Sequence, residues 1–320
     1  MLARVGESLY WMSRYLERAE DTARLINAST MLLMDMPRGA SFGWEGLLNV
    51  VGLDKAFHEL YDQASETAVM SFLIQDERNP SSIFACVRHA RENTRTFREV
   101  LPRESWEWVN ELYLYTSTHL ASALDRRKRF EVLSEVIRRR QTLVGLLVGT
   151  MSRDEAFQLM RLGRNVERAD MTSRVLDVSY AINLPYENSQ YYDLIWMSVL
   201  HSLSAHQMYR RHVGVHARGH KVLAFLLDDL KFPRSVRHCL HEIESALGGL
   251  PPGDEPRQRV QAMLNQADQA DFRKLAKNGL HDFCDNIQTS LAELNVIINR
   301  TYFRVEQPQK KMTQSQSSQA

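Results

Sequence analysis

Hydrophobic residues near the start of the chain recur at alternating spacings of three and four, the period of a helix with one apolar stripe. The first stripe consists of Val5, Leu9, Met12, Leu16, Ala19, Ala23 and Ile26. The same spacing returns in Leu159, Leu162, Val166, Ala169, Ser173 and Leu176. Alternating apolar and polar positions bounded by turn residues, the pattern typical of strands, do not occur. We therefore predict an all-α fold.

Polar residues indicate where several of these helices begin. The segment Ser152–Glu155 has the form of a capping box in front of the second stripe. Asn79-Pro80 is typical of an N-cap followed by proline at the first helical position. The sequence therefore predicts a helix that starts there and continues to Leu101, where Pro102 ends it.

Several stretches of the chain occur twice in the same order. Residues 14–25 read RYLERAEDTARL and residues 164–175 read RNVERADMTSRV, at an offset of 150. Residues 72–86, FLIQDERNPSSIFAC, match residues 225–239, FLLDDLKFPRSVRHC, at an offset of 153, and Trp44 matches Trp196 at an offset of 152. We predict two pseudo-repeated helical bundles packed together, residues 1–150 and 151–305. The polar tail, residues 306–320, is expected to be disordered.

Each copy of the repeated helix carries a Glu-Arg pair on the side opposite its apolar stripe. In the first copy this side holds Arg14, Glu17 and Arg18, and Trp11 and Tyr15 border it. Because apolar groups flank the charges, we expect this helix to be central and covered on most sides. The second copy keeps the same three charged residues, Arg164, Glu167 and Arg168.

A buried glutamate must be paired, because an unpaired buried charge is strongly destabilising. Two interpretations of the Glu-Arg pairs remain open. In the one we favour, they form a structural clasp in which each glutamate bridges to arginines of its own or of the other copy. In the other, the arginines bind a carboxylate or phosphate and a glutamate acts as a base or as an orienting group.

Other chemistry-bearing residues receive local interpretations. Asp76 and Asp229 hold equivalent repeat positions, and we expect them to complement the exposed N–H groups of a helix N-terminus. A less favoured alternative places both beside the Glu-Arg pairs. His212, His216 and His220 have a spacing that metal ligands use, but glycines interrupt the stretch and it contains no acidic residue. We predict no metal site.

Charge and composition exclude several classes of protein. The chain has 40 Lys and Arg against 39 Asp and Glu, which argues against a broad nucleic-acid surface. We interpret the basic runs at residues 126–129 and 138–140 as solvated helix ends. Three cysteines do not form a disulfide framework, and Cys86 and Cys239 are expected to be buried and unreactive. Because no signal-peptide core and no long apolar run occur, we expect no membrane partner and a cytoplasmic location.

The segments YLERAEDTAR, NVERADMTSR, NPSSI, ARENTRTFRE and FPRSVRHCL together resemble the alpha-E domain family of bacterial proteins, over nearly the whole chain to about residue 305. The resemblance places the Glu-Arg motif of that family on Glu17-Arg18 and on Glu167-Arg168. It also implies signature positions in the first copy, at Asp76, Asn79, Pro80, Ser81, Ser82, Ala90, Arg91, Glu92, Asn93, Arg95 and Trp106. The second copy has nothing similar to ARENTR, so the two halves need not be functionally equal.

The resemblance implies a functional setting without an established activity. Such proteins are typically encoded beside, or fused to, a circularly permuted ATP-grasp ligase, and transglutaminase-like or Anbu-type peptidases often accompany them. We therefore expect a helical partner or accessory subunit of an ATP-grasp system that forms amide bonds in peptide synthesis or modification. The alternative is an enzyme or ligand-binding protein whose Glu-Arg motifs bind a carboxylate- or amine-bearing substrate. We expect no cofactor for either function.

Overall fold

The computed structural model describes residues 3–35, 43–181 and 189–304. These residues form fifteen α-helices and contain no strand, which confirms the all-α prediction. The first half contains α1 (Ala3–Asp35), α2 (Trp44–Val51), α3 (Asp54–His58), α4 (Glu66–Ile74), α5 (Ile83–Thr96), α6 (Arg103–His119) and α7 (Arg126–Thr150). The second half contains α8 (Glu155–Ala181), α9 (Ser189–Ser202), α10 (His206–His212), α11 (Gly219–Asp228), α12 (Val236–Gly248), α13 (Asp254–Asp268), α14 (Phe272–Leu275) and α15 (Leu280–Ile298).

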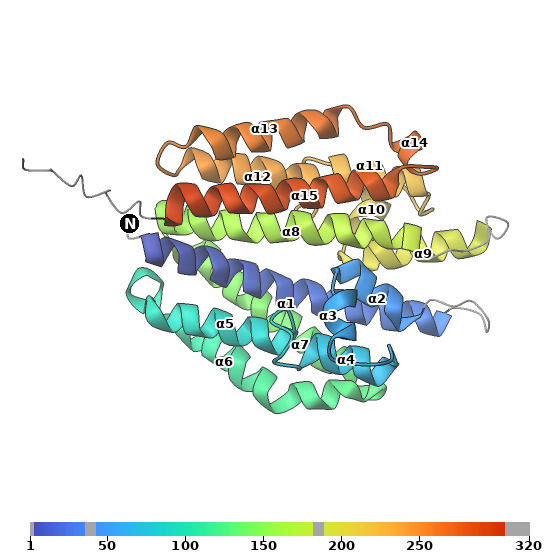
Figure 1. The fold of residues 1–320 in the computed structure, drawn as a ribbon, viewed down its shortest axis with the longest axis horizontal. Coiled ribbons are helices and arrows are strands. Elements are labelled where there is room, and N and C mark those ends of the chain that lie inside the picture. The colour runs from blue at the N-terminus through green and yellow to red at the C-terminus, as the bar shows by residue number, and fades with distance from the viewer. Residues whose placement is uncertain (1–2, 36–42, 182–188, 305–320) are drawn as a thin grey trace, which may run out of the picture.

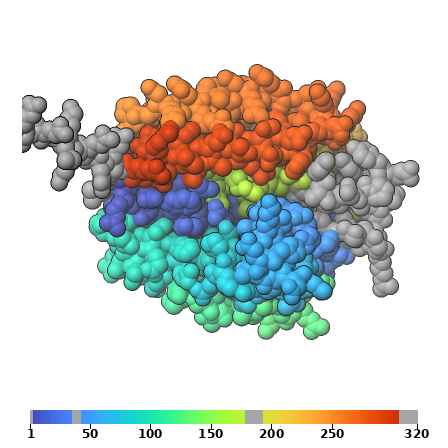
Figure 2. Space-filling view, in the orientation of Figure 1, coloured from blue at the N-terminus to red at the C-terminus, as the bar shows by residue number. Residues whose placement is uncertain are grey.

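Two long helices, α1 and α8, run side by side in the same direction through the middle of the molecule (Figure 1). Helices α5 and α7 pack on α1, whereas α12 and α15 pack on α8. Helix α2 of the first half packs against α8, and α9 of the second half packs against α1, so the halves interlock. Figure 2 shows that only part of α1 and α8 reaches the face in view.

The apolar stripes of α1 and α8 are buried, as their spacing predicts. Leu16 and Leu162 are 3 % and 0 % exposed. The charged side of α1 is buried too, since Glu17 and Asp21 are 0 % and 3 % exposed. Helix α1 is therefore covered on most sides, and its predicted central position is confirmed.

Helix α5 begins later than the sequence indicates. Its N-cap is Ser82, whose Oγ accepts a hydrogen bond from the Ala85 backbone N–H at 3.2 Å. Asn79 instead closes the preceding turn, where its Oδ1 accepts from the Ser81 backbone N–H at 2.9 Å. The prediction of an N-cap at Asn79 was wrong because its side chain stabilises a turn in front of the helix.

The two halves share local structure beyond their sequence matches. The sulfur atoms of Cys86 and Cys239 each lie 3.7 Å from the carbonyl oxygen of the proline six residues earlier. Gly52 and Ser204 both have left-handed backbone, with φ of 67° and 50°. Ser204 accepts a hydrogen bond from Arg24, a residue of the first copy of the repeated helix. The division into residues 1–150 and 151–305 stays a prediction, and residues 305–320 lie outside the described part of the chain.

The histidines considered for a metal site are separated in the structure. His212 ends α10, His216 lies in the following loop and His220 lies in α11, so they do not share one helix face. Among the described residues no group of three or more His, Cys, Asp or Glu could hold a metal ion. No helix within the described ranges has the length and apolar character needed to span a membrane.

Candidate functional site

Helices α1 and α8 approach each other closely because residue 163 is a glycine. A Cβ atom on Gly163 would lie 2.4 Å from the backbone oxygen of Tyr10, well inside van der Waals contact. Any larger residue would push the two helices apart. The close approach places the Glu-Arg pair of each helix against that of the other.

The first of two charge clusters surrounds Glu167, and we call it the Glu167 cluster. Arg14 Nε lies 2.7 Å from Glu167 Oε2, and Arg18 Nε lies 2.5 Å from Glu167 Oε1. Glu167 is 1 % exposed. Burial alone would raise its pKa, but the charges and hydrogen bonds of Arg18 and Arg14 outweigh burial and hold the pKa at about 2. Glu167 is therefore a carboxylate fixed by both arginines of the opposite motif.

Neutral groups complete the Glu167 cluster. Asn295 Oδ1 accepts from Arg14 Nη1 at 2.7 Å and from the Tyr10 hydroxyl at 2.8 Å. The Arg14 guanidinium also lies over the Trp11 ring, 5.0 Å from its centroid. Arg18 Nη1 donates to Ser81 Oγ at 3.2 Å. Arg14 and Arg18 thus have neutral partners in addition to Glu167.

The second cluster, the Glu17 cluster, repeats the pairing in the opposite direction. Arg168 of α8 donates through Nε to Glu17 Oε1 at 2.6 Å and through Nη2 to Oε2 at 3.1 Å. Arg140 of α7 also donates to Glu17, and Arg234 Nη1 lies 3.3 Å from Glu17 Oε1. Glu17 is 0 % exposed, and these guanidinium groups lower its pKa despite its burial. Three arginines therefore surround one glutamate.

Two further carboxylates, Glu20 and Asp21, are buried in the Glu17 cluster. Arg140 Nη1 lies 2.5 Å from Glu20 Oε2, and Arg234 lies 2.8 Å from Glu20 Oε1 and 2.5 Å from Asp21 Oδ1. Asp21 Oδ2 has no hydrogen-bond partner in the described structure. Burial and the negative charge of Glu17 raise the pKa of Asp21 to about 7, because the positive charge of Arg234 offsets them only in part.

Arg164 is the repeat counterpart of Arg14, yet it pairs with no described residue. Its Nε atom is buried and has no hydrogen-bond partner within the described ranges. Burial and the positive charge of Arg168 lower its pKa to about 10. Arg140 lies beside Glu17 instead, and Arg140 and Arg164 both line a cavity of about 30 Å³. The two motifs therefore do not form identical sites.

A surface cavity of about 280 Å³ opens beside the Glu17 cluster. Its lining includes Arg24, Arg140, Arg168, Arg234 and Glu20. Each interpretation of the Glu-Arg pairs thus has one observation in its favour. The burial and mutual pairing of both glutamates favour a clasp, whereas the arginine-lined cavity favours a ligand site at one of the two clusters.

Asp76 lies outside both clusters, at the turn after α4. Its Oδ2 accepts from the Tyr61 hydroxyl at 2.7 Å and from Arg78 Nη2 at 2.7 Å. Its Oδ1 accepts from the Arg78 backbone N–H at 3.0 Å. The hydrogen bonds from Arg78, assisted by Tyr61, lower the pKa of Asp76 to about 2. Asp76 therefore has a local role, but the expected contact with a helix N-terminus was wrong, because Asp76 stabilises the turn in front of the helix instead.

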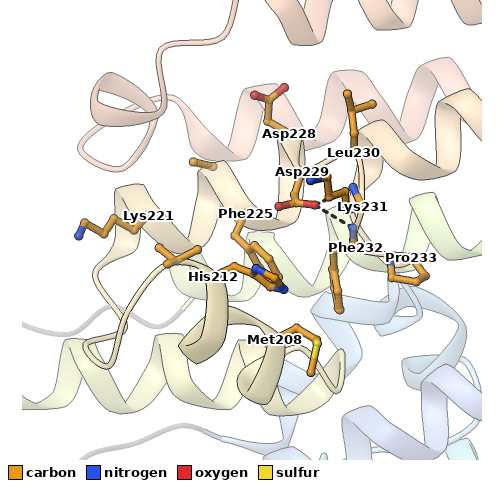
Figure 3. Close-up of a pocket in the computed structure, with 12 residues that line it drawn as sticks. Met208, His212, Lys221, Phe225, Asp228, Asp229, Leu230, Lys231, Phe232 and Pro233 are labelled. Carbon is orange, nitrogen blue, oxygen red and sulfur yellow. Dashed lines mark hydrogen bonds between the residues drawn. The ribbon is translucent and has the colours of Figure 1, made fainter.

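Asp229 lies at the matching turn after α11, on a much larger cavity (Figure 3). Its Oδ1 accepts from the backbone N–H groups of Lys231 at 2.7 Å and Phe232 at 2.8 Å. The cavity has a volume of about 630 Å³. Like Asp76, Asp229 does not join the Glu-Arg residues.

The ARENTR residues form a separate group on α5. Arg91 donates to Asn110 Oδ1 at 2.8 Å and to Glu92 Oε1 at 3.0 Å, and its guanidinium lies 4.6 Å from the Tyr113 ring centroid. Glu92 and Asn93 line a surface cavity of about 340 Å³. None of these residues bonds to Glu17 or Glu167 in the described structure, so the structure does not bring the two groups together.

Four members of the Glu17 cluster are not among the candidate residues that the sequence predicted: Arg140, Arg234, Glu20 and Asp21. We interpreted residues 138–140 as a solvated helix end, which is wrong for Arg140, because it is 3 % exposed. Its spacing contained the signal, since residue 140 continues the apolar stripe of Leu133, Val136, Leu143 and Leu147. Arg129 in the other basic run is likewise buried, and its Nη1 lies 2.8 Å from Glu66.

The three cysteines are buried, and burial raises the pKa of Cys86 and of Cys239 to about 12. Thiols of this kind are poor nucleophiles at neutral pH. The motif glutamates are also poor general bases, because a strongly lowered pKa means weak proton affinity. What the clusters can do is hold two helices together and present positive charge at one cavity.

Residues 1–303 match the Alpha-E family, described as a predicted alpha-helical domain with a conserved ER motif. The chain therefore belongs to this family, as the resemblance of its Glu-Arg segments implied. No curated protein and no solved structure matches the chain.

Proposed function

We propose that this member of the Alpha-E family is a non-catalytic helical subunit of an amide-bond-forming system. In this proposal it binds an ATP-grasp ligase, or the substrate of that ligase, and organises the reaction. The ligase is of the circularly permuted type, and a transglutaminase-like or Anbu-type peptidase is a further partner. The system makes or modifies peptides.

One observation carries this proposal. The glutamates and most arginines of the two motifs bond to one another in the core, with Glu17 and Glu167 at most 1 % exposed. A general base must reach a substrate and must have a pKa near the working pH, and these glutamates meet neither condition. The motif is therefore better suited to holding a scaffold together than to catalysis.

The test uses the full chain from its native host. We expect a tagged chain to co-purify with an ATP-grasp ligase, and we expect amide formation coupled to ATP turnover to rise when the chain is added to that ligase. Absence of co-purification together with unchanged turnover would contradict the proposal. A matched control is the same ligase with an unrelated helical protein at equal concentration.

A second candidate function has its own observation, the arginine-lined cavity of about 280 Å³ beside the Glu17 cluster. In this alternative the cavity binds a carboxylate-bearing substrate, since guanidinium groups recognise carboxylates in bidentate fashion. Glu20, which already accepts from three arginines there, would compete with such a substrate.

A cavity-filling variant separates the two functions. Gln141 lines this cavity and is exposed, whereas its neighbour Thr142 is exposed without lining it. Gln141→Trp fills the cavity without removing an ion pair of the Glu17 cluster. A scaffold predicts equal ligase support from Gln141→Trp and from the control Thr142→Trp. Loss of support in Gln141→Trp alone would favour the ligand-binding function.

A further inference from the structure

The segments around α3 and α10 have matching backbones in the two halves. The Tyr61 backbone N–H donates to the Phe57 oxygen at 2.9 Å, and the Val213 backbone N–H donates to the Tyr209 oxygen at 2.8 Å. Phe57 and Tyr209 themselves donate to the residue four positions earlier, at 2.9 Å in both cases. These bonds assign Val213 to the place that Tyr61 holds in the first half.

The neighbouring aromatic rings and acidic turns match as well. Phe72 meets Phe57 edge-on at a centroid distance of 5.3 Å, and Phe225 meets Tyr209 edge-on at 5.7 Å. The turns that follow are closed by Asp76 and by Asp229, each accepting from the backbone N–H two residues later. The first half is thus a structural template for the second at this place.

The halves differ in what covers the acidic side chain. In the first half the Tyr61 ring stacks on Phe57 at 5.0 Å with an interplanar angle of 9°. Its hydroxyl donates to Asp76 Oδ2 at 2.7 Å, and Arg78 lies over the ring at 5.4 Å. Tyr61 therefore fills the space beside the carboxylate and, together with Arg78, satisfies its second oxygen.

In the second half the small side chain of Val213 leaves this space open. Asp229 Oδ2 accepts no hydrogen bond from a described residue, and the cavity of about 630 Å³ lies beside it. Phe225 and Phe232 form apolar parts of its wall, and Figure 3 shows both near Asp229. Met208 at its rim is 39 % exposed. The cavity therefore combines an open carboxylate oxygen with an apolar wall.

We infer that this cavity binds a phenol group, the chemistry of a tyrosyl side chain, whose hydroxyl donates to Asp229 Oδ2. The ring then packs on Phe225 and Phe232, as Tyr61 packs on aromatic rings in the first half. Lys221 and Lys231 also line the cavity and attract an anionic group attached to the ring, such as a carboxylate. The volume lies within the range of about 300–1,000 Å³ that is usual for small-ligand pockets. This inference is independent of a ligase partner.

The first experiment measures binding of N-acetyl-tyrosinamide to the full chain by NMR titration, with N-acetyl-phenylalaninamide as the matched probe. The two probes differ only in the hydroxyl, and a hydrogen bond to a charged group corresponds to about tenfold in affinity or more. We expect the tyrosine probe to bind at least about tenfold more tightly. Equal affinities would overturn the inference.

Two variants test whether the tyrosine probe binds in this cavity, one by filling the cavity and one by removing the charge of Asp229. Val213→Tyr places the first-half residue in the cavity, and we expect it to abolish binding without loss of helicity by circular dichroism. Asp229→Asn keeps an oxygen for the turn but removes its charge, and we expect it to weaken binding of the tyrosine probe by about fivefold or more. Asp76→Asn is the matched control and should leave the affinity unchanged, because Tyr61 already covers that carboxylate. Unchanged binding in Asp229→Asn would overturn the inference, whether or not Val213→Tyr folds.

A gain of binding provides an independent check. Arg78 also donates to Asp76 Oδ2, so the variant that copies the second half is the double substitution Tyr61→Val with Arg78→Lys. It should open the equivalent space in the first half, so that the stoichiometry of the tyrosine probe rises from one to two. A final pair of probes identifies the source of the group. Tighter binding of a blocked Gly-Gly-Tyr-Gly-Gly peptide than of p-cresol indicates a tyrosine within a polypeptide, and equal binding indicates a small phenol.

Discussion

The Glu167 cluster and the Glu17 cluster contain the same motif on two parallel helices, but their surroundings differ. Glu167 is paired by two arginines, both from α1, and neutral groups such as Asn295 complete that cluster. Glu17 is paired by Arg168 from α8, and Arg140 from α7 and Arg234 from the turn before α12 join it. The reciprocal Glu-Arg pairing between α1 and α8 is therefore the same in both clusters, whereas the additional residues that join each cluster differ.

The difference shows how an added residue changes a repeated site. Arg140 enters the Glu17 cluster from another helix, and Arg164, the counterpart of Arg14, is left without a partner in the described structure. Burial, together with the negative charges of Glu17 and Glu20, raises the pKa of Asp21 in this cluster to about 7. The Glu167 cluster has fewer charges, and its carboxylate has a pKa of about 2. The same motif therefore gives one simple ion-pair site and one crowded site.

The largest expected effect is that of Glu17→Gln. It keeps volume and hydrogen-bonding capacity but leaves Arg168, Arg140 and Arg234 without the central negative charge. We expect the free energy of unfolding to fall by about 3–5 kcal/mol, the usual result of breaking a buried ion pair. Urea unfolding measures it, with exposed Glu104→Gln as the control. A drop in melting temperature below about 2 °C would refute a clasp at this cluster.

A smaller effect is expected for Glu167→Gln. Arg14 keeps its hydrogen bond to Asn295, and the Arg18 side chain is 22 % exposed, so water can solvate it in part. We expect a loss of about 2–3 kcal/mol, toward the lower end for a buried pair. The same urea unfolding checks it. A loss equal to or larger than that of Glu17→Gln would show that the additional arginines of the Glu17 cluster add no stability.

Asp21 makes the stability contributed by the Glu17 cluster depend on pH. Its folded pKa of about 7 lies above its ordinary value of 3.8, so the folded state holds the proton more tightly than the unfolded state. The resulting stability is full below about pH 4 and is lost as the pH rises through about 7. We expect a loss on the order of 2 kcal/mol between pH 5 and pH 7.

The measurement is the difference between wild type and Asp21→Asn in urea unfolding at several pH values. The amide introduced by this substitution does not titrate, so the difference isolates Asp21 from the histidines. Glu17, Glu20 and Glu167 have lowered pKa values and titrate below this window. A difference that stays constant from pH 5 to pH 8 would contradict a raised pKa at Asp21.

The sequence predicts features that depend on local spacing. The stripes of α1 and α8 and the central position of α1 follow from helical period alone, and the structure confirms them. The pairing of Glu17 and Glu167 with arginines of the other helix agrees with the clasp interpretation, which rests on the need of a buried charge for a partner. The Alpha-E family also follows from the quoted segments.

The partners of Glu17 from elsewhere in the chain could not be predicted in the same way. Arg234 approaches through a turn whose geometry no periodicity describes, and Arg140 is recognised only when a basic residue is allowed within an apolar stripe. The ARENTR segment, which occurs only in the first half, likewise gives no sign of its partners, and Arg91 bonds to Asn110 and Glu92. Tertiary packing, which spacing does not encode, decides these contacts.

The smallest expected effect is that of Arg164→Met, which tests whether Arg164 is the unused member of the repeat. The change removes a half-buried cation that makes no ion pair with the described residues, and the methionine keeps much of the apolar stem. Removing an uncompensated charge relieves its desolvation, so we expect stability to change by less than about 1 kcal/mol or to rise. The matched variant is Arg14→Met, which deprives Glu167 of one of two arginines and should cost about 2 kcal/mol or more. Equal losses from both substitutions in urea unfolding would mean that Arg164 has a stabilising partner after all, and the asymmetry between the two clusters would then be smaller than their contacts indicate.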